Sequence, residues 1–340
     1  MLLRISTLFV AVLVAILSAS WFLLQKEPAH QVAFYYWRTQ WNAPEVPSEK
    51  LYLRFFDVKP ELGQPVPVSP LQLSKKLPVN IAVTPVVYLT NSVFFESTPA
   101  HAEALAEKVF DKVNAMAKHH AIEFKELQID CDWSDSTRAR YFHFANQLRA
   151  RLHSSGKTLS ATLRLHQIKY SKRTGVPPID RGMLMFYNFG RLEAEREGSS
   201  IFNAQDAKKY SSYIATYPLP LDLSLPLFSW AVHSRAGSVI GLLEKTRADE
   251  IETFDGFMRI ADSKFEAKRA FFFNGRFFEP GDRLVIESTK PEDTLEAARL
   301  AHEGAGSNSK YGTIAFFDLD ERNLRNYAAS NFEEILSVFD

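Results

Sequence analysis

Two aspartates stand two residues apart in the run Leu-Gln-Ile-Asp-Cys-Asp-Trp-Ser, residues 127–134, and they are the side chains best suited to chemistry. Side chains alternate along an extended strand, so Gln128, Asp130 and Asp132 share one face and Cys131 lies on the other. Adjacent carboxylates on a strand repel each other and disfavour the strand. We therefore expect the pair to bind a ligand or transfer a proton. The alternative is that each aspartate pairs with an arginine of a neighbouring strand for structural reasons alone.

The elements that must position this pair alternate between strand-like and helix-like patterns, which favours a parallel sheet. Eight strands and the helices between them predict a TIM-type (β/α)8 barrel over residues 29–340. The expected strands are Val32–Trp37, Leu51–Asp57, Val79–Leu89, Leu127–Asp132, Thr158–His166, Met183–Asn188, Leu221–Val232 and Thr313–Asp318. The expected helices are Ala100–His119, Ser136–His153, Asp206–Ile214, Val239–Arg247, Glu292–His302 and Glu333–Phe339.

The fifth expected strand distinguishes a barrel from an open doubly wound α/β sheet, which is the alternative fold. Its polar side chains fall on one face and its apolar side chains on the other. An open sheet covered by helices on both sides would be apolar throughout. A barrel lumen that leads to a site accounts for the polar face: Thr158, Ser160, Thr162, Arg164 and His166.

One segment departs from the strand–helix repeat. Asn274-Gly275 stands between two aromatic runs, and this dipeptide is a strong signal for a two-residue hairpin turn. We predict a small antiparallel β insertion over residues 252–290, after the seventh strand and before its helix.

The amino terminus predicts a membrane segment rather than part of the barrel. Residues 5–24 are uncharged, and twenty helical residues span about 30 Å, the thickness of a bilayer's hydrocarbon core. We expect residues 1–28 to be an uncleaved signal anchor, with the body outside the cytoplasm in the periplasm or at the cell surface. The alternative is a cleaved signal peptide and a secreted protein.

Composition excludes several partners and frameworks. The 340 residues hold 40 acidic and 40 basic side chains, so charge gives no support for a nucleic-acid partner. The single cysteine excludes an internal disulfide framework and a cysteine-based zinc site.

Active-site groups of such barrels lie where strands end. The ends of the predicted strands carry aromatic rings, cations and carboxylates together. Rings stack on the apolar faces of sugars, and acids bind hydroxyls or transfer protons, so we expect a carbohydrate ligand. The expected catalytic residues are Asp130 and Asp132, and the expected substrate-binding residues are Trp37, Arg54, Tyr88, Trp133, Arg164, His166, Tyr187, Asn188, Trp230 and Asp318.

Three of these strands carry a resemblance. Asp130-Cys131-Asp132-Trp133 resembles the Asp-x-x-Asp-x-Asp-x-Glu signature of family 18 glycoside hydrolases, the chitinase-like barrels. Met185-Phe186-Tyr187-Asn188 is similar to their Met-x-Tyr-Asp segment, and Leu225-Pro226-Leu227-Phe228 to their seventh strand. The chain as a whole also resembles an uncharacterised group of exported bacterial barrel proteins, including the stretch 175–182. The family resemblance implies a TIM barrel with Asp130, Asp132 and Tyr187 at its site.

The departures from the family pattern concern the acid. The proton-donating glutamate of the signature falls on Ser134, which cannot act as a general acid near neutral pH. Family 18 enzymes use the acetamido group of the substrate as nucleophile, and this mechanism still requires an acid. Asp132 is the first candidate because a charge on Asp130 would raise its pKa. The other candidates are Asp135, which could instead cap the following helix, and Asp318, Asp320 and Glu321.

A metal site is a further alternative, because Asp130, Asp132 and His166 come from adjacent strands and could bind a divalent cation. Arg164 on the same face would oppose a cation, so we expect neither metal nor cofactor. We predict an exported glycoside hydrolase-like protein that acts on or binds a polysaccharide. The alternatives are a catalytically inactive carbohydrate-binding envelope protein on the same barrel and a structural envelope protein.

Overall fold

The computed structural model describes residues 30–44, 48–190, 192–194, 198–306 and 311–340. The predicted membrane segment at residues 5–24 lies outside these ranges. Within them, no helix has both the length and the apolar character that crossing a bilayer requires.

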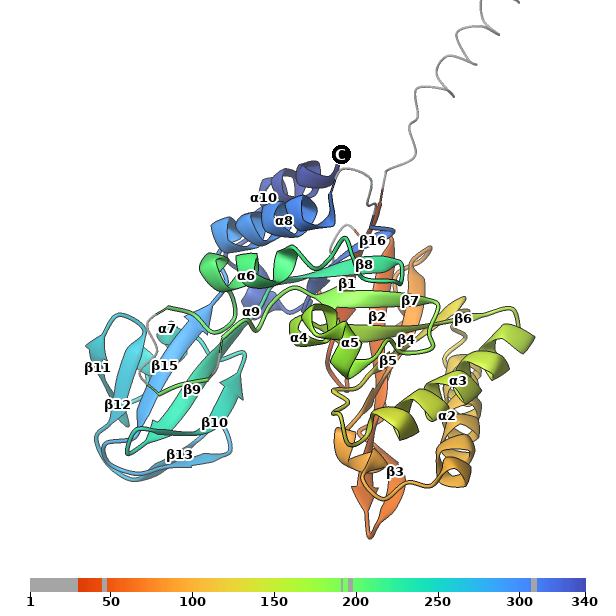
Figure 1. Cartoon of the computed structure of the whole chain (residues 1–340). Helices are drawn as coiled ribbons and strands as arrows, with labels where there is room; N and C mark the ends of the chain where they lie inside the picture. The colour runs from red at the N-terminus through yellow and green to blue at the C-terminus, as the bar shows by residue number, and fades with distance from the viewer. Residues whose placement is uncertain (1–29, 45–47, 191, 195–197, 307–310) are drawn as a thin grey trace, which may run out of the picture.

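Eight parallel strands close into a barrel (Figure 1). Around the barrel, β1 pairs with β16 on one side and with β2 on the other, so the sheet has no gap. The predicted TIM-type barrel is confirmed, and the open sheet is excluded. The barrel strands are β1 (Gln31–Tyr36), β2 (Lys50–Glu61), β4 (Ala82–Leu89), β5 (Glu126–Asp130), β6 (Thr158–Arg164), β7 (Arg181–Met185), β8 (Leu221–Pro226) and β16 (Thr313–Phe317).

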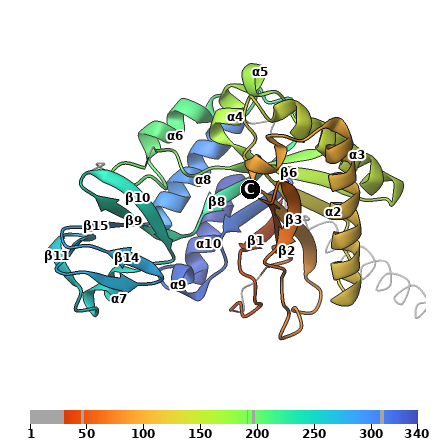
Figure 2. The same ribbon diagram turned by 90° about the horizontal axis from the view of Figure 1, so that it is seen from below.

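Helices cover the outside of the barrel unevenly. After β2 the chain returns as the antiparallel strand β3 (Gln64–Val68) instead of a helix. In Figure 2, α2, α3, α4, α6 and α8 form an arc around the strands. The helices are η1 (Asn91–Phe94), α2 (Pro99–His119), α3 (Arg138–Ser154), α4 (Leu165–Lys169), α5 (Ser171–Thr174), α6 (Ala204–Ser211), α8 (Pro291–Ala305), α9 (Glu321–Leu324), α10 (Ala329–Leu336) and η2 (Ser337–Phe339).

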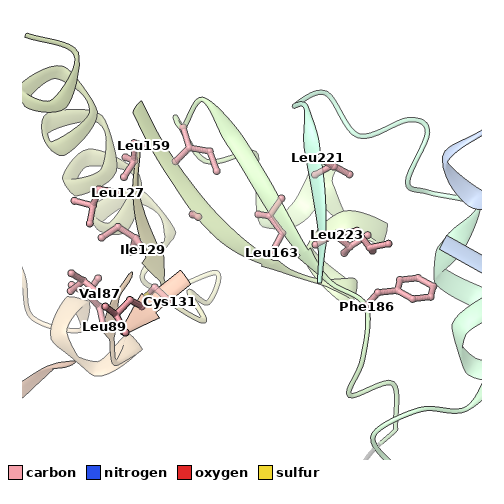
Figure 3. Close-up of a cluster of buried hydrophobic side chains, with 14 of the residues drawn as sticks. Val87, Leu89, Leu127, Ile129, Cys131, Leu159, Leu163, Phe186, Leu221 and Leu223 are labelled. Carbon is pink, nitrogen blue, oxygen red and sulfur yellow. The ribbon is translucent and has the colours of Figure 1, made fainter. Parts of the chain in front are cut away.

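The main core lies between the outer face of the strands and these helices. Leu127, Ile129 and Cys131 of the β5 segment point outward into it, beside Leu159 and Leu163 of β6 (Figure 3). Each fully buried leucine of this kind contributes about 1.5–3 kcal/mol to stability. This burial explains why the alternate residues of β5 must face the lumen, Asp130 included.

The lumen is polar at its base, as the alternation in the fifth strand predicted. Tyr35 donates a hydrogen bond of 2.6 Å to the side-chain oxygen of Gln128, and Gln128 in turn donates to Ser160 at 3.3 Å. Below them, Lys50 Nζ lies 2.8 Å from Glu126 Oε2. These contacts place hydrogen-bonded and ion-paired polar groups in the lower lumen.

An antiparallel insertion stands beside the barrel between β8 and α8 (Figure 1). Asn274 and Gly275 form the turn of its β13–β14 hairpin, with φ angles of +46° and +72° as a type I′ turn requires. The predicted hairpin is confirmed. The insertion holds β9 (Ser229–Arg235), β10 (Ser238–Glu244), α7 (Ala248–Glu252), β11 (Phe257–Ala261), β12 (Lys264–Ala267), β13 (Phe271–Phe273), β14 (Arg276–Phe278) and β15 (Arg283–Ser288).

The structure corrects three expected boundaries around this insertion. Leu221–Val232 is not one strand, because β8 ends at Pro226 and the chain changes from parallel pairing with β16 to antiparallel pairing with β15. The insertion consequently begins at Ser229 rather than at residue 252. Val239–Arg247 is not a helix, because it pairs with β9 as the strand β10. A short apolar run is compatible with either element, and the neighbouring strand decides.

One buried carboxylate makes the insertion sensitive to acid. Asp282 accepts hydrogen bonds from His233 at 2.9 Å and from Arg235 at 2.7 Å. Burial alone would raise the pKa of Asp282, but these bonds and one from the Glu279 amide lower it to about 2. A depressed folded-state pKa stabilises the fold above the unfolded value of 3.8, and this contribution disappears as the pH falls towards 2.

We therefore expect Asp282→Asn to lower the free energy of unfolding by about 2 kcal/mol at pH 7. The difference from wild type should shrink below pH 4 and vanish near pH 2, as measured by urea unfolding at each pH. Asp262→Asn, a fully exposed aspartate of the same insertion, is the control and should change little. An equal loss at both pH values would contradict the assignment.

Candidate functional site

A cavity of about 850 Å³ opens at the carboxyl end of the barrel strands. This is the end at which barrel enzymes of this architecture place their reacting groups. Its walls combine rings, cations and carboxylates from the barrel, from the insertion and from α9. The lining residues are Trp37, Arg38, Thr39, Gln40, Asn42, Arg54, Asp57, Tyr88, Asp130, Arg164, Met185, Tyr187, Asn188, Glu244, Lys245, Phe317 and Arg322.

Asp130 forms part of the wall of this cavity at the end of β5. Its side chain accepts a hydrogen bond of 2.6 Å from Thr162 and lies 3.5 Å from a guanidinium nitrogen of Arg164. Burial raises the pKa of Asp130 above its ordinary value, Arg164 opposes the shift, and Asp132 adds to it. A buried carboxyl with a raised pKa keeps its proton to a higher pH than an ordinary aspartate, which is the direction of shift that a general acid requires.

Asp132 has a different environment. Its side chain is 53% exposed, and both of its oxygens pair with Arg164, one of them at 3.2 Å from Nη2. Arg164 belongs to the neighbouring strand β6, so the ion pair predicted from the sequence as the structural alternative is present. Arg164 nevertheless lines the open cavity. A two-point guanidinium contact stabilises the carboxylate anion. The structure therefore favours Asp130 over Asp132, the first candidate from sequence, as the proton-holding group.

A second guanidinium–carboxylate pair lies on the same wall. Arg54 Nε donates to Asp57 Oδ1 at 2.7 Å, and Arg54 Nη2 lies 2.6 Å from Oδ2. The guanidinium also stands over the indole ring of Trp37, 5.9 Å from its centroid. These contacts hold the cation and the ring in one orientation.

Aromatic rings give the cavity an apolar surface. Trp37 packs edge-on against Tyr88 at 6.4 Å and lies 5.7 Å from Phe317. Tyr187 stacks on the other side of Phe317, also at 5.7 Å. Four adjacent rings at the mouth of a barrel are suited to the apolar faces of sugar rings.

The eighth barrel strand leads into a charged cluster. Lys245, which follows β10 of the insertion, lies 2.8 Å from Asp318 and 3.4 Å from Asp320. Arg38 pairs with Asp320 from the opposite side. Asp318 and Asp320 are buried beneath the two cations, which themselves line the cavity. Burial raises the pKa of Asp318, and Lys245 opposes that shift.

The structure brings together most of the residues expected at the site. Asp132 lies beside the cavity through Arg164, and Asp318 lies behind Lys245. The expected residues on the wall are Trp37, Arg54, Tyr88, Asp130, Arg164, Tyr187 and Asn188.

Besides Asp132 and Asp318, three further expected residues do not line the cavity. Trp133 is buried outside the barrel, where it stacks on Tyr141 at 5.0 Å and donates to the Thr174 carbonyl. Trp230 packs at the junction with the insertion and donates to Glu287. His166 lies in α4, because β6 ends one residue after Leu163 and the chain turns into a helix. An aromatic or imidazole side chain near a strand end does not reveal by itself which side it faces.

Ten lining residues were not among those expected at the site: Arg38, Thr39, Gln40, Asn42, Asp57, Met185, Glu244, Lys245, Phe317 and Arg322. Arg38 follows the first predicted strand and Asp57 ends the second, so their position at strand ends was a usable signal. Glu244 and Lys245 fall in the segment expected to be a helix, and no pattern in the chain pointed to them. Arg322 follows the eighth strand and reaches the cavity from α9.

Ser134, the residue that aligns with the glutamate of the signature, lies in the turn before α3. Its hydroxyl accepts a hydrogen bond from Asn91 at 3.2 Å, and its amide donates to Thr137 at 2.9 Å. The residue thus organises the turn before α3 and does not line the cavity. Asp135 is exposed and lies 3.8 Å from Arg173 instead of capping the helix.

Among the described residues, no three His, Cys, Asp or Glu side chains are grouped to hold a metal ion. At the position weighed for a metal, the guanidinium of Arg164 occupies the space between Asp130 and Asp132.

Solved structures with a similar fold include a spore cortex-lytic enzyme and chitinases. SleL, a spore cortex-lytic enzyme of Bacillus cereus, superposes with a TM-score of 0.50 at 14% identity, covering 92% of this chain and 74% of the enzyme. A chitinase from Chromobacterium violaceum gives 0.51 at 12% identity, over 91% of this chain and 98% of the chitinase. The fold is that of the chitinase-like barrels.

A third structure agrees with these two. The C-terminal domain of a candidate chitinase from Desulfitobacterium hafniense gives a TM-score of 0.55 at 10% identity, over 92% of this chain and 100% of the domain. The resemblance drawn from the strand motifs is thus confirmed at the level of the fold. No protein-family model matches the chain, and no curated protein matches it in sequence.

Proposed function

We propose that the protein is a glycoside hydrolase-like barrel that binds a polysaccharide chain in the cavity and cleaves it with Asp130. The observation that carries the proposal is the buried, raised-pKa carboxyl of Asp130 on the wall of an 850 Å³ cavity. The chitinase-like fold and the rings of Trp37, Tyr88 and Tyr187 support a sugar as the ligand.

The chemistry follows from the positions of these groups. Asp130 transfers a proton to the oxygen that leaves the scissile glycosidic bond, while the oxygen of a water molecule forms a new bond to the anomeric carbon. The proton that this water loses returns to Asp130 and restores the acid. Tyr187, Trp37 and Tyr88 hold the sugar rings, and Arg164 keeps Asp130 and Asp132 in fixed orientations. Of the two carboxyls on β5, Glu126 and Asp130, only Asp130 lines the cavity, which supports its role as the acid.

A second candidate function is binding without turnover. Arg164 pairs with both strand-end aspartates, and this observation favours a carbohydrate-binding protein of the cell envelope. A carboxyl that its arginine keeps ionised would position a sugar hydroxyl rather than donate a proton.

The two candidates differ in one measurement. Purified full-length protein in detergent is incubated with a panel of soluble polysaccharides, and new reducing ends are counted over hours. Turnover by wild type and its loss in Asp130→Asn support the hydrolase. Binding of a polysaccharide that stays intact over days would leave only the binding protein.

We also infer export, because residues 5–24 have the length and apolar character of a membrane segment. Alkaline phosphatase fused after residue 340 should be active in cells if the body lies outside the cytoplasm. The same fusion to a chain lacking residues 1–28 is the control and should be inactive.

A further inference from the structure

Five cationic side chains from separate parts of the chain line the single cavity described above. Arg38 follows β1, Arg54 lies in β2 and Arg164 ends β6, while Lys245 follows β10 and Arg322 lies in α9. Neutral sugars do not require so many full charges, because hydroxyls are recognised equally well by amides and hydroxyls.

The carboxylates that pair with these cations are mostly behind the wall. Asp318 and Asp320 are 2% and 1% exposed, whereas their partners Lys245 and Arg38 are 17% and 37% exposed. Neither aspartate lines the cavity, and both cations do. The cations therefore cover buried acids and present their remaining donors to the open space.

Arg322 pairs with a less buried acid. It is 43% exposed, its Nε lies 3.4 Å from Glu250, which is 31% exposed and does not line the cavity, and its Nη1 donates to the Lys245 carbonyl at 3.2 Å. Asp132, which pairs with Arg164, is also not part of the wall. The carboxylates on the wall are Asp57, Asp130 and Glu244, and the first two are already held by Arg54 and Arg164.

The two arginines that hold wall carboxylates retain donors as well. Arg54 and Arg164 each bind their aspartates through Nε and Nη2, and within the described residues neither Nη1 group donates a hydrogen bond. The wall carries five cations against three carboxylates, two of which are already bonded, so it favours a ligand that supplies acceptors and negative charge.

We infer that the cavity selects an anionic polysaccharide, one whose sugars carry carboxylate or sulfate groups. Lys245 and Arg322 bind the anionic group beside the aromatic wall of Trp37 and Phe317. This inference rests on the proposed function, since it names the class of chain that the same site takes.

The test measures the affinity of the full-length protein for matched anionic and neutral chains at 50 and 500 mM NaCl. Polygalacturonate is compared with its fully methyl-esterified form, and dextran sulfate with dextran. We expect about tenfold tighter binding of at least one anionic chain than of its neutral partner, and loss of that preference at high salt. The first pair reports on carboxylates and the second on sulfates.

Arg322→Gln is the informative variant, because it leaves no buried acid without a partner. It should weaken binding of the anionic chain several-fold and leave the neutral chain unaffected. Arg325→Gln, one helical turn away and outside the cavity wall, is the matched control. Lys245→Gln should have a larger effect, provided that its unfolding curve matches that of wild type.

The outcomes separate this inference from the proposed function. Equal or tighter binding of neutral chains would overturn the anionic preference and leave a polysaccharide-binding barrel. An anionic preference that Arg322→Gln does not reduce would place the selectivity outside this cavity and overturn the assignment. Binding of no polysaccharide at all would overturn both.

Discussion

Replacing Asp130 with asparagine is expected to slow polysaccharide hydrolysis by roughly 10²–10⁴-fold, the usual contribution of a positioned general acid. Asparagine has the same shape, and its amide oxygen can still accept the hydrogen bond from Thr162. Binding of the chain should therefore change far less than kcat. Steady-state kinetics on a soluble polysaccharide, with affinity measured separately, distinguishes the two effects.

The pH dependence provides a second readout for Asp130. Its pKa is raised by burial, and an acid is active only while protonated, so wild-type activity should fall as the pH rises through that pKa. This alkaline limb should disappear from the residual activity of Asp130→Asn. Asp135→Asn, an exposed aspartate of the same loop, is the control and should retain full activity. A large loss in the control with none in Asp130→Asn would move the acid to Asp135.

Replacing Arg164 with methionine should lower the free energy of unfolding by about 3 kcal/mol at pH 7, because Asp130, buried without its cation, must then stay protonated at a pH where the unfolded chain ionises or carry an uncompensated charge. Asp132 is half-exposed and can be solvated by water, so Asp130 accounts for most of the loss. Chemical denaturation of wild type and variant measures the difference.

The sign of the pH effect follows from the raised pKa of Asp130. A buried acid whose folded-state pKa exceeds its unfolded value of 3.8 lowers the stability of the fold progressively as the pH rises from 3.8 to the folded-state pKa, and the loss is complete above that pKa. Removing Arg164 enlarges this shift, so the penalty should be largest at pH 7 and smallest near pH 4. The double variant Asp130→Asn, Arg164→Met should recover most of the stability.

A control separates charge from packing at this position. Arg173→Met removes an exposed guanidinium that lies 3.8 Å from Asp135, and it should change stability by less than about 0.5 kcal/mol. If the loss in Arg164→Met is the same at pH 4 and pH 7, missing side-chain packing and not an uncompensated charge is the cause.

Much of the barrel could be read from local patterns. Alternation along Thr158–Arg164 placed polar groups inside and leucines outside, because a closed sheet has one dry outer face and one lumen. The same rule correctly directed Asp130 inward and Cys131 outward. Asn274-Gly275 specified its turn because few residues adopt positive φ angles. These features depend on interactions between residues near in the chain.

The pairing of the insertion could not be read in the same way. Val239, Leu242 and Leu243 suit a helix face as well as a strand, and contact with β9 decides in favour of the strand. The end of that strand delivers Glu244 and Lys245 to a cavity formed mainly by the barrel. Their contribution depends on the position of the insertion, which no local pattern encodes.

The sequence by itself determined the barrel, the inward direction of Asp130 and the absence of an acid at Ser134, because strand alternation and residue identity suffice for these. Only the tertiary structure decided which strand-end residues share the cavity. Trp133 and Trp230 turn into packed regions, whereas Arg38, Lys245 and Arg322 converge from elements far apart in the chain. The physical reason is that burial and ion pairing between distant elements decide whether each of these side chains faces the cavity or a packed region. The nearest neighbours in sequence do not decide it.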